Sequence, residues 1–204
     1  MFVYNPAKLP AAALPKSILD LAGPAWKGRW GGAASGADFQ AIVGAMLEMR
    51  GETVTLDWLR GMKANATAYR GNGAVMAAVN AGQIDGGVIY HYYYFQDQAR
   101  TGDNSKNVAL HYFKNQDPGA FVSVSGGGVL ASSKNPGEAQ QFLKWILGKQ
   151  AQEIIQNSME YATAAGVASH PKLPPLGTLD APKLDPAKLN GKKVTELMMR
   201  AGLL

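Results

Sequence analysis

The stretch Ile84-Asp85-Gly86-Gly87-Val88-Ile89-Tyr90-His91-Tyr92-Tyr93-Tyr94-Phe95 decides how the rest of the chain is interpreted. Its first half holds a short apolar run, Gly87-Val88-Ile89, which is typical of a buried strand. Its second half gathers four tyrosines and one histidine within five residues. Ligands of an open α/β sheet bind just beyond the carboxyl ends of its strands. The stretch therefore predicts a buried strand that leads directly into a binding site.

The tyrosine cluster has two interpretations on its residues alone. A phenol has a pKa of about 10 and is a weak, neutral ligand at pH 7. A hard cation of high charge prefers oxygen donors and favours the phenolate, so adjacent tyrosines are candidate metal ligands. Regular strand geometry would send Tyr92 and Tyr93 to opposite faces, so their convergence requires irregular backbone at a helix start. The other interpretation is an aromatic cluster packed in a core or a subunit interface.

Length and composition exclude several classes of function. The 204 residues suffice for one large domain or two small lobes. The net charge of +5 suits an anionic partner, an acidic surface on a partner, or simple solubility. The sequence contains no dense run of basic residues, so the charge does not indicate nucleic-acid binding. The absence of cysteine excludes disulfides, thiolate metal sites and cysteine nucleophiles. No apolar stretch approaches the ~18 residues that span a bilayer. We recognise no signal peptide, because Met1–Tyr4 enters a strand at once.

Strands and helices alternate through the first half of the chain, which predicts an α/β fold with a mainly parallel sheet. We expect strands over 2–4, 30–34, 87–89, 108–113, 121–125 and 129–130. We expect helices over 17–21, from 37 to a stop at Gly51, over 55–62 and 74–81, from the tyrosines to 99, and over 135–147, 150–157 and 192–201, the last burying Leu197 and Met198. The segment 161–190 is rich in proline and alanine and predicts a long surface loop.

Two polar residues lie at helix starts that could hold an anion. Ser35 precedes the first amphipathic helix, where a hydroxyl and free backbone N–H groups bind anions or simply cap the helix. Asn72 precedes the helix 74–81 and is expected to cap it. The glycine-rich run Ser125–Gly128 lacks the lysine and the following helix of a phosphate loop, so it predicts no nucleotide site.

Four stretches together resemble the ferric-iron-binding proteins of bacterial ABC importers, a group of periplasmic binding proteins similar to transferrin. They are Leu14–Leu21 with Trp26–Arg29, Ser35-Gly36-Ala37, Gln83–Gly86 through Tyr92-Tyr93, and Asp117–Ala120 with Ser125-Gly126. The tyrosine pair is the most diagnostic of these. The resemblance implies a periplasmic-binding-protein fold of type II with one complete lobe and an incomplete remnant of the other.

The same resemblance implies the division of the chain. Residues 1–4 would form a hinge strand, 5–118 the complete second lobe, 119–125 the return hinge strand, and 126–204 a helical segment that normally completes the first lobe. Family members carry a further segment before the first hinge strand, so we expect an N-terminally truncated chain. Apolar residues such as Phe142, Leu143 and Ile146 would then be exposed, which favours a homodimer formed by segment exchange.

The resemblance also implies the site and the function. Tyr92 and Tyr93 would bind Fe³⁺ as phenolates, with Tyr90 a further candidate ligand and His91 a group behind the ligands. The synergistic anion, phosphate or carbonate, would lie at Ser35, Gly36, Ala37 and Asn72. Tyr90, His91 and Tyr94 depart from the asparagine and tryptophan residues of some members. The protein would capture iron in the periplasm and deliver it to the permease and ATPase of an importer, with weaker binding where the first lobe is missing.

Three other functions stay open. A protein of this fold could bind an organic or phosphate-bearing anion without metal, using Ser35, Gly36 and Asn72. An enzyme could use His91, His111 or His170, but the sequence offers no nucleophile–base pair and no carboxylate dyad, so we expect no catalysis. A nucleic-acid binder could stack bases on Tyr92–Tyr94, which ranks last because the basic residues are dispersed.

Overall fold

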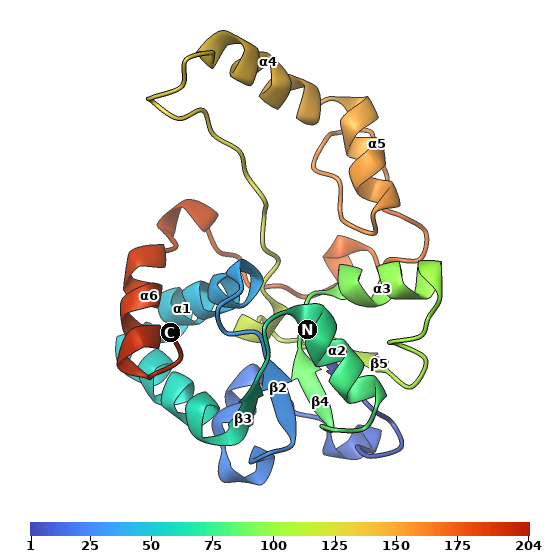
Figure 1. Ribbon diagram of the computed structural model, residues 1–204, viewed down its shortest axis with the longest axis vertical. Helices are drawn as coiled ribbons and strands as arrows, with labels where there is room; N and C mark the ends of the chain where they lie inside the picture. The colour runs from blue at the N-terminus through green and yellow to red at the C-terminus, as the bar shows by residue number, and fades with distance from the viewer. The chain divides into compact units, whose positions relative to one another are not determined.

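The computed structural model describes residues 1–204, which form two compact units (Figure 1). Unit 1 comprises Met1–Ser123 and Leu176–Leu204, and unit 2 comprises Val124–Pro175. The chain therefore leaves unit 1, builds unit 2 and returns to unit 1. This division differs from the expected one, which kept residues 126–204 together. The hinge roles of residues 1–4 and 119–125 remain predictions.

Unit 1 is built on a sheet of five short strands in the order β3-β2-β4-β1-β5. The strands are β1 (Phe2–Tyr4), β2 (Trp30–Gly32), β3 (Ala66–Ala68), β4 (Gly86–Val88) and β5 (Ala109–His111). β2 runs parallel to β3 and β4, whereas β1 runs antiparallel to β4 and β5. The prediction of a mainly parallel sheet from the strands between Trp30 and Tyr90 is confirmed, and β1 is the one strand that runs against the others. Antiparallel strands are commonly added beside a parallel core in α/β proteins.

Four α-helices belong to unit 1: α1 (Ala37–Asn65), α2 (Asn72–Asn80), α3 (His91–Arg100) and α6 (Gly191–Arg200). Short 3-10 helices lie at Ala11–Ala13, Ile18–Ala22, Pro24–Trp26, Pro118–Ala120, Leu176–Thr178 and Pro186–Lys188. α1 joins two of the expected helices end to end. Its backbone breaks at Gly51, whose φ of 79° and ψ of 174° suit glycine. None of the helices combines the length and the apolar composition that crossing a membrane requires.

The sheet has an apolar core on each face, because successive side chains of a strand point to opposite sides. Phe2 and Trp30 join Phe39 and Met46 of α1 in the larger core. Val3 joins the smaller core with residues of α2. A Cβ added at Gly87 of β4 would lie 2.2 Å from Cγ1 of Val75, so α2 packs directly on this glycine. Close packing of this kind fixes where the helices begin relative to the strand ends.

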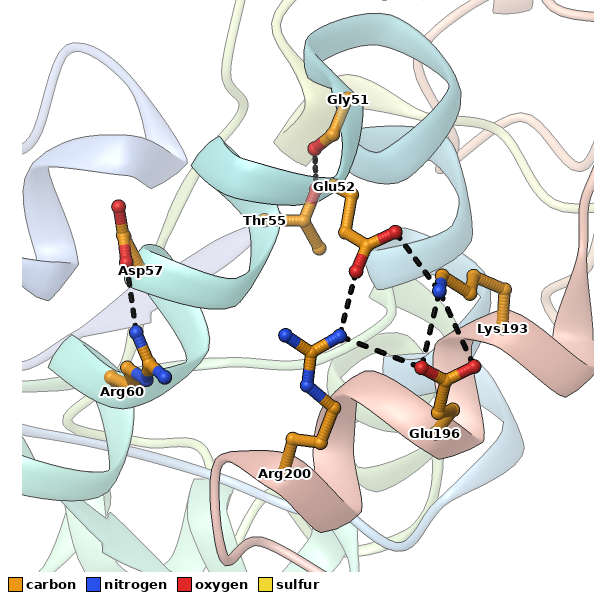
Figure 2. A network of polar contacts seen from close by, with 8 residues as sticks. All are labelled: Gly51, Glu52, Thr55, Asp57, Arg60, Lys193, Glu196 and Arg200. Carbon is orange, nitrogen blue, oxygen red and sulfur yellow. Dashed lines mark hydrogen bonds and ion pairs between the residues drawn. The ribbon is translucent and has the colours of Figure 1, made fainter.

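Helix α6 returns to unit 1 after unit 2 and packs on α1 (Figure 1). Leu197 and Met198 are fully buried in the larger core, which confirms the prediction for this helix. Four charged side chains close a ring between the two helices (Figure 2): Glu52 pairs with Lys193 at 2.9 Å and Arg200 at 2.6 Å, and Glu196 pairs with Lys193 at 3.1 Å and Arg200 at 3.4 Å. Exposed ion pairs contribute little to stability because solvent and salt screen them, so apolar burial dominates this contact.

Unit 2 contains α4 (Pro136–Ile146) and α5 (Lys149–Asn157), close to the predicted helices. The buried side chain of Gln152 ties the following loop to them: it donates to the Ile146 carbonyl at 3.0 Å and accepts from the Thr163 amide at 2.7 Å. The predicted strands over 121–125 and 129–130 are wrong, because no strand lies beside either segment to pair with it. Leu130 is 75% exposed.

Candidate metal centre

The topology of the sheet brings three helix starts together. β2, β3 and β4 run parallel, and they are followed by α1, α2 and α3 respectively. The carboxyl ends of parallel strands share one edge of a sheet, and ligands bind at that edge. The N-termini of the three helices therefore meet there, and the candidate site is built from their first residues.

The tyrosine cluster lies at the start of α3, beyond the carboxyl end of β4 as expected. Tyr90 has extended backbone (φ −95°, ψ 152°) and precedes the helix, which begins at His91. Tyr92 and Tyr93 both belong to its first turn, and their ring centroids are 4.5 Å apart with the planes inclined by 30°. The change from strand to helix before Tyr92 is the irregularity that allows the two rings to converge.

A carboxylate from α1 binds one of these phenols. The Tyr92 hydroxyl donates to Oδ2 of Asp38 at 2.7 Å, and Nδ2 of Asn72 donates to the same oxygen at 2.9 Å. Asp38 lies in the first turn of α1, Asn72 is the first residue of α2, and Tyr92 is on α3. One carboxylate oxygen thus joins all three helix starts.

Burial and this carboxylate favour the neutral phenol of Tyr92. The pKa of Tyr92 is raised far above its usual range, first by burial and then by the hydrogen bond to Asp38 and the proximity of Tyr93. Burial also raises the pKa of Tyr90, although the nearby Ser123 hydroxyl works in the opposite direction. The Tyr90 hydroxyl is buried, and no group reaches it in hydrogen-bonding geometry. A cation that bound these phenols would have to displace their protons.

The residues predicted to bind the anion fall into two groups: three lie at the start of α1, and Asn72 lies at the start of α2. Ser35 is exposed, and Gly36 precedes α1 with its amide already donating to the Ala33 carbonyl at 2.9 Å. Ala37 is the first residue of the helix. Asn72 does not cap α2 as predicted, because Gly71 occupies the capping position and the Asn72 amide donates to Asp38.

The three histidines are dispersed. The His91 ring stands edge-on to Tyr92, with centroids 5.8 Å apart. His111 contacts the Pro15 carbonyl at 2.8 Å, and His170 accepts from the Lys172 amide at 3.2 Å in unit 2. No group of three or more His, Asp or Glu side chains could hold a metal ion. A metal site in this chain would therefore depend on phenol oxygens and on Asp38.

Asp38 is the site residue that the sequence analysis missed. It follows Ser35 in the pattern Ser-x-x-Asp, which usually marks a helix start. An acid in the first turn is also favoured by the helix dipole. Both explanations are local, and neither reveals the contact with Tyr92.

Comparison with known proteins defines the class to which this site belongs. A family model described as bacterial extracellular solute-binding protein matches residues 1–190, and the chain belongs to that family. The family is defined by the binding of solutes and not by catalysis, in agreement with the expectation that the chain is not an enzyme. The chain has the α/β fold of the type II periplasmic binding proteins, as its similarity to solved structures of such proteins shows.

Individual relatives narrow the class. The chain is 67% identical over 206 residues to the Fe(3+)-binding periplasmic protein of Serratia marcescens, covering all of this chain and 61% of that protein. The structure of iron-bound HitA from Pseudomonas aeruginosa is similar, with a TM-score of 0.92, 41% identity, and coverage of 99% of this chain and 66% of HitA. A Trichodesmium IdiA (FutA) structure in complex with iron and citrate has a TM-score of 0.73 and 26% identity over 100% of this chain and 67% of that one.

Proposed function

We propose that this chain binds ferric iron as its cargo through the phenolates of Tyr92 and Tyr93 and the carboxylate of Asp38. The observation that carries this proposal is the 2.7 Å contact between the Tyr92 and Asp38 oxygens beside the tilted Tyr93 ring. Oxygen donors are the ligands that hard cations prefer. Neighbouring ligand oxygens of an octahedral hard cation at about 2.0–2.1 Å lie about 2.9 Å apart, close to this separation.

Charge balance supports the same three ligands. Two phenolates and one carboxylate neutralise Fe³⁺, so the cargo site needs no further negative charge from this chain. The proton that Tyr92 shares with Asp38 must leave when iron binds, because a phenolate cannot donate a hydrogen bond. A synergistic anion such as phosphate or carbonate would fill a remaining position at the start of α1, near Ser35, Gly36 and Ala37.

Tyr90 is the third tyrosine of the candidate site, and His91 lies behind it. The Tyr90 ring is 6.3 Å from that of Tyr92, but its hydroxyl does not reach Asp38 within hydrogen-bonding distance. We assign the phenolate ligands to Tyr92 and Tyr93, and Tyr90 stands as a further candidate. His91 supports the rings without binding the metal.

A visible absorption titration of the whole chain with ferric citrate tests the proposal. Iron bound by tyrosinate gives a broad charge-transfer band. We expect this band in the wild type, its loss in Tyr92→Phe/Tyr93→Phe, and weaker binding in Asp38→Asn. Tyr94→Phe is the matched control on the same helix, and it should leave the band unchanged. A folded wild-type chain without any band would contradict the proposal.

The second candidate function is the binding of an organic or phosphate-bearing anion without metal. The start of α1 favours it, because helix N-termini attract anions. Titration with inorganic phosphate in the absence of iron distinguishes the two functions. Binding of phosphate alone, unchanged in Tyr92→Phe/Tyr93→Phe, would favour the anion function.

The chain spans 61% of the length of its Serratia relative, so the activity of the whole protein is a further proposal. We propose that the whole protein works in the periplasm and delivers iron to the permease and ATPase of an ABC importer. The segment beyond the covered part would close over the tyrosines, so this chain alone should bind iron more weakly than the longer relatives. No nucleic acid is expected as a partner.

A further inference from the structure

The side chain of Asn72 is directed at Asp38 and not at its own helix. Asn72 is 7% exposed and is the first residue of α2, one position after the capping residue Gly71. Its Nδ2 donates to Oδ2 of Asp38 at 2.9 Å. A buried amide that donates to a carboxylate on another helix restrains the orientation of that carboxylate.

The Asp38 carboxylate is held by two donors. Tyr92 and Asn72 both donate to Oδ2, at 2.7 and 2.9 Å. These bonds differ in what happens on metal binding, because the Tyr92 proton must leave whereas the amide protons of Asn72 stay. Asn72 is therefore the donor that can still orient the carboxylate once Tyr92 has become a phenolate.

We propose that Asn72 is a positioning residue, which aims Oδ2 of Asp38 at the iron. This inference rests on the proposed function of the chain. It departs from the role that the family resemblance implies, in which Asn72 would bind the synergistic anion directly. In the structure its amide acts on a carboxylate built into the protein, so the effect of Asn72 on iron binding should not require an added anion.

The test compares two asparagines on the same helix. Asn72→Leu removes the amide and keeps a similar volume. Asn80→Leu is the matched control, because Asn80 also donates from its side chain, to the Asp103 carbonyl at 2.9 Å, at the other end of α2. Removing a partner that orients a metal ligand typically lowers metal affinity about 10- to 100-fold. We expect a loss of this size, and a shifted tyrosinate–iron band, in Asn72→Leu alone.

Each measurement is made with ferric citrate, with and without added inorganic phosphate. The expected loss in Asn72→Leu is the same in both conditions. A loss confined to samples with phosphate would mean that Asn72 binds the anion, and would overturn the inference. Circular dichroism verifies that the variant is folded, and Asn72→Gln, which keeps the donor, should recover part of the affinity if the leucine variant unfolds.

A double-mutant cycle separates positioning from a general structural role. In an Asp38→Ala chain there is no carboxylate to orient, so adding Asn72→Leu should lower the affinity no further. A full additional loss would overturn the inference. A wild-type chain without any tyrosinate–iron band would overturn the proposed function together with this inference, whereas a normal band and affinity in Asn72→Leu would overturn the inference alone.

Discussion

The ring of Tyr90 lies 6.3 Å from that of Tyr92, yet only the Tyr92 hydroxyl reaches a hydrogen-bond acceptor in the site. The two phenols are two residues apart and equally part of the sequence motif. Their different surroundings separate a group that is engaged with Asp38 from one that is buried without a partner. This difference leads to opposite expectations for the removal of the two hydroxyls.

Tyr90→Phe should leave the tyrosinate–iron band in place and should not destabilise the chain. A buried hydroxyl without a partner carries a desolvation penalty of about 1–3 kcal/mol, which phenylalanine removes. Urea unfolding and the ferric citrate titration measure the two effects. Tyr92→Phe is the comparison, and it should weaken the band and lower stability by about 1 kcal/mol through the lost hydrogen bond. A band lost in Tyr90→Phe would identify Tyr90 as a ligand instead.

Two glycines of α1 should respond to alanine with opposite signs. A Cβ at Gly44 would meet Cγ2 of Val194 at 3.7 Å, an ordinary contact that partly fills a pocket of about 260 Å³ between α1 and the segment 189–194. Because glycine within a helix costs about 1 kcal/mol relative to alanine, Gly44→Ala should stabilise the chain by about that amount.

Gly61→Ala is the matched substitution in the same helix. Its Cβ would lie 2.6 Å from Cβ of Ala22 and 2.7 Å from the Ala22 carbonyl oxygen, which is too close for either to remain in place. We expect a loss of about 1–3 kcal/mol, as for other overpacked sites. Thermal unfolding of both variants under one condition gives the two changes in stability. Equal changes would show that helix propensity alone, and not the space around each glycine, determines the effect of alanine.

The charged ring between α1 and α6 should give a small dependence of stability on pH. Hydrogen bonds from Lys193 and Arg200 lower the pKa of Glu52 below 4.5. A carboxyl whose pKa is lowered by folding stabilises the protein above its unfolded pKa, and that contribution is lost as the pH falls through the lower folded value. Glu52→Gln should remove this part of the acid dependence, as followed by melting temperature at low salt.

Asp57→Asn is the control for Glu52→Gln. Asp57 pairs with Arg60 on the same helix at 3.3 Å and does not bridge to α6 (Figure 2). Its replacement should change the acid dependence less than Glu52→Gln. High salt should reduce the difference between the two variants because exposed ion pairs are screened.

Exposed apolar residues on α4 predict self-association. Phe142 is 60% exposed and Trp145 50% exposed, and their rings stack with the planes inclined by 16°. We propose a homodimer by segment exchange, with the Phe142→Glu/Trp145→Glu variant shifted toward monomer. Light scattering during gel filtration gives the mass, with Lys144→Glu on the same helix as the control for charge. A wild-type chain that stays monomeric at working concentration would contradict the dimer.

The helices could be predicted because their signals are local. Asn135-Pro136 marks the start of α4, and the apolar spacing of α6 correctly predicts the burial of Leu197 and Met198. Strands were harder, because pairing decides them. Ala66–Ala68 has no apolar pattern but forms β3 beside β2, whereas the apolar run from Phe121 finds no partner and forms no strand.

The candidate site could be predicted only in part. Tyr92 and Tyr93 are adjacent in sequence and stood out at once. Asp38 precedes Tyr92 by 54 positions, and only the parallel arrangement of β2 and β4 brings their helices to one edge. The role of Asn72 could not be predicted for the same reason, because its partner lies on another helix.

The return of residues 176–204 to unit 1 has a consequence for the order of synthesis. The ribosome makes the tyrosines, Asp38 and Asn72 early, but it must complete unit 2 before it supplies α6. Until then the face of α1 that receives Val194, Leu197 and Met198 lacks its cover. Incomplete apolar cores of nascent chains are prone to aggregate, and domains otherwise fold in the order in which they emerge. A holding chaperone would therefore be needed most while residues 124–175 are being translated.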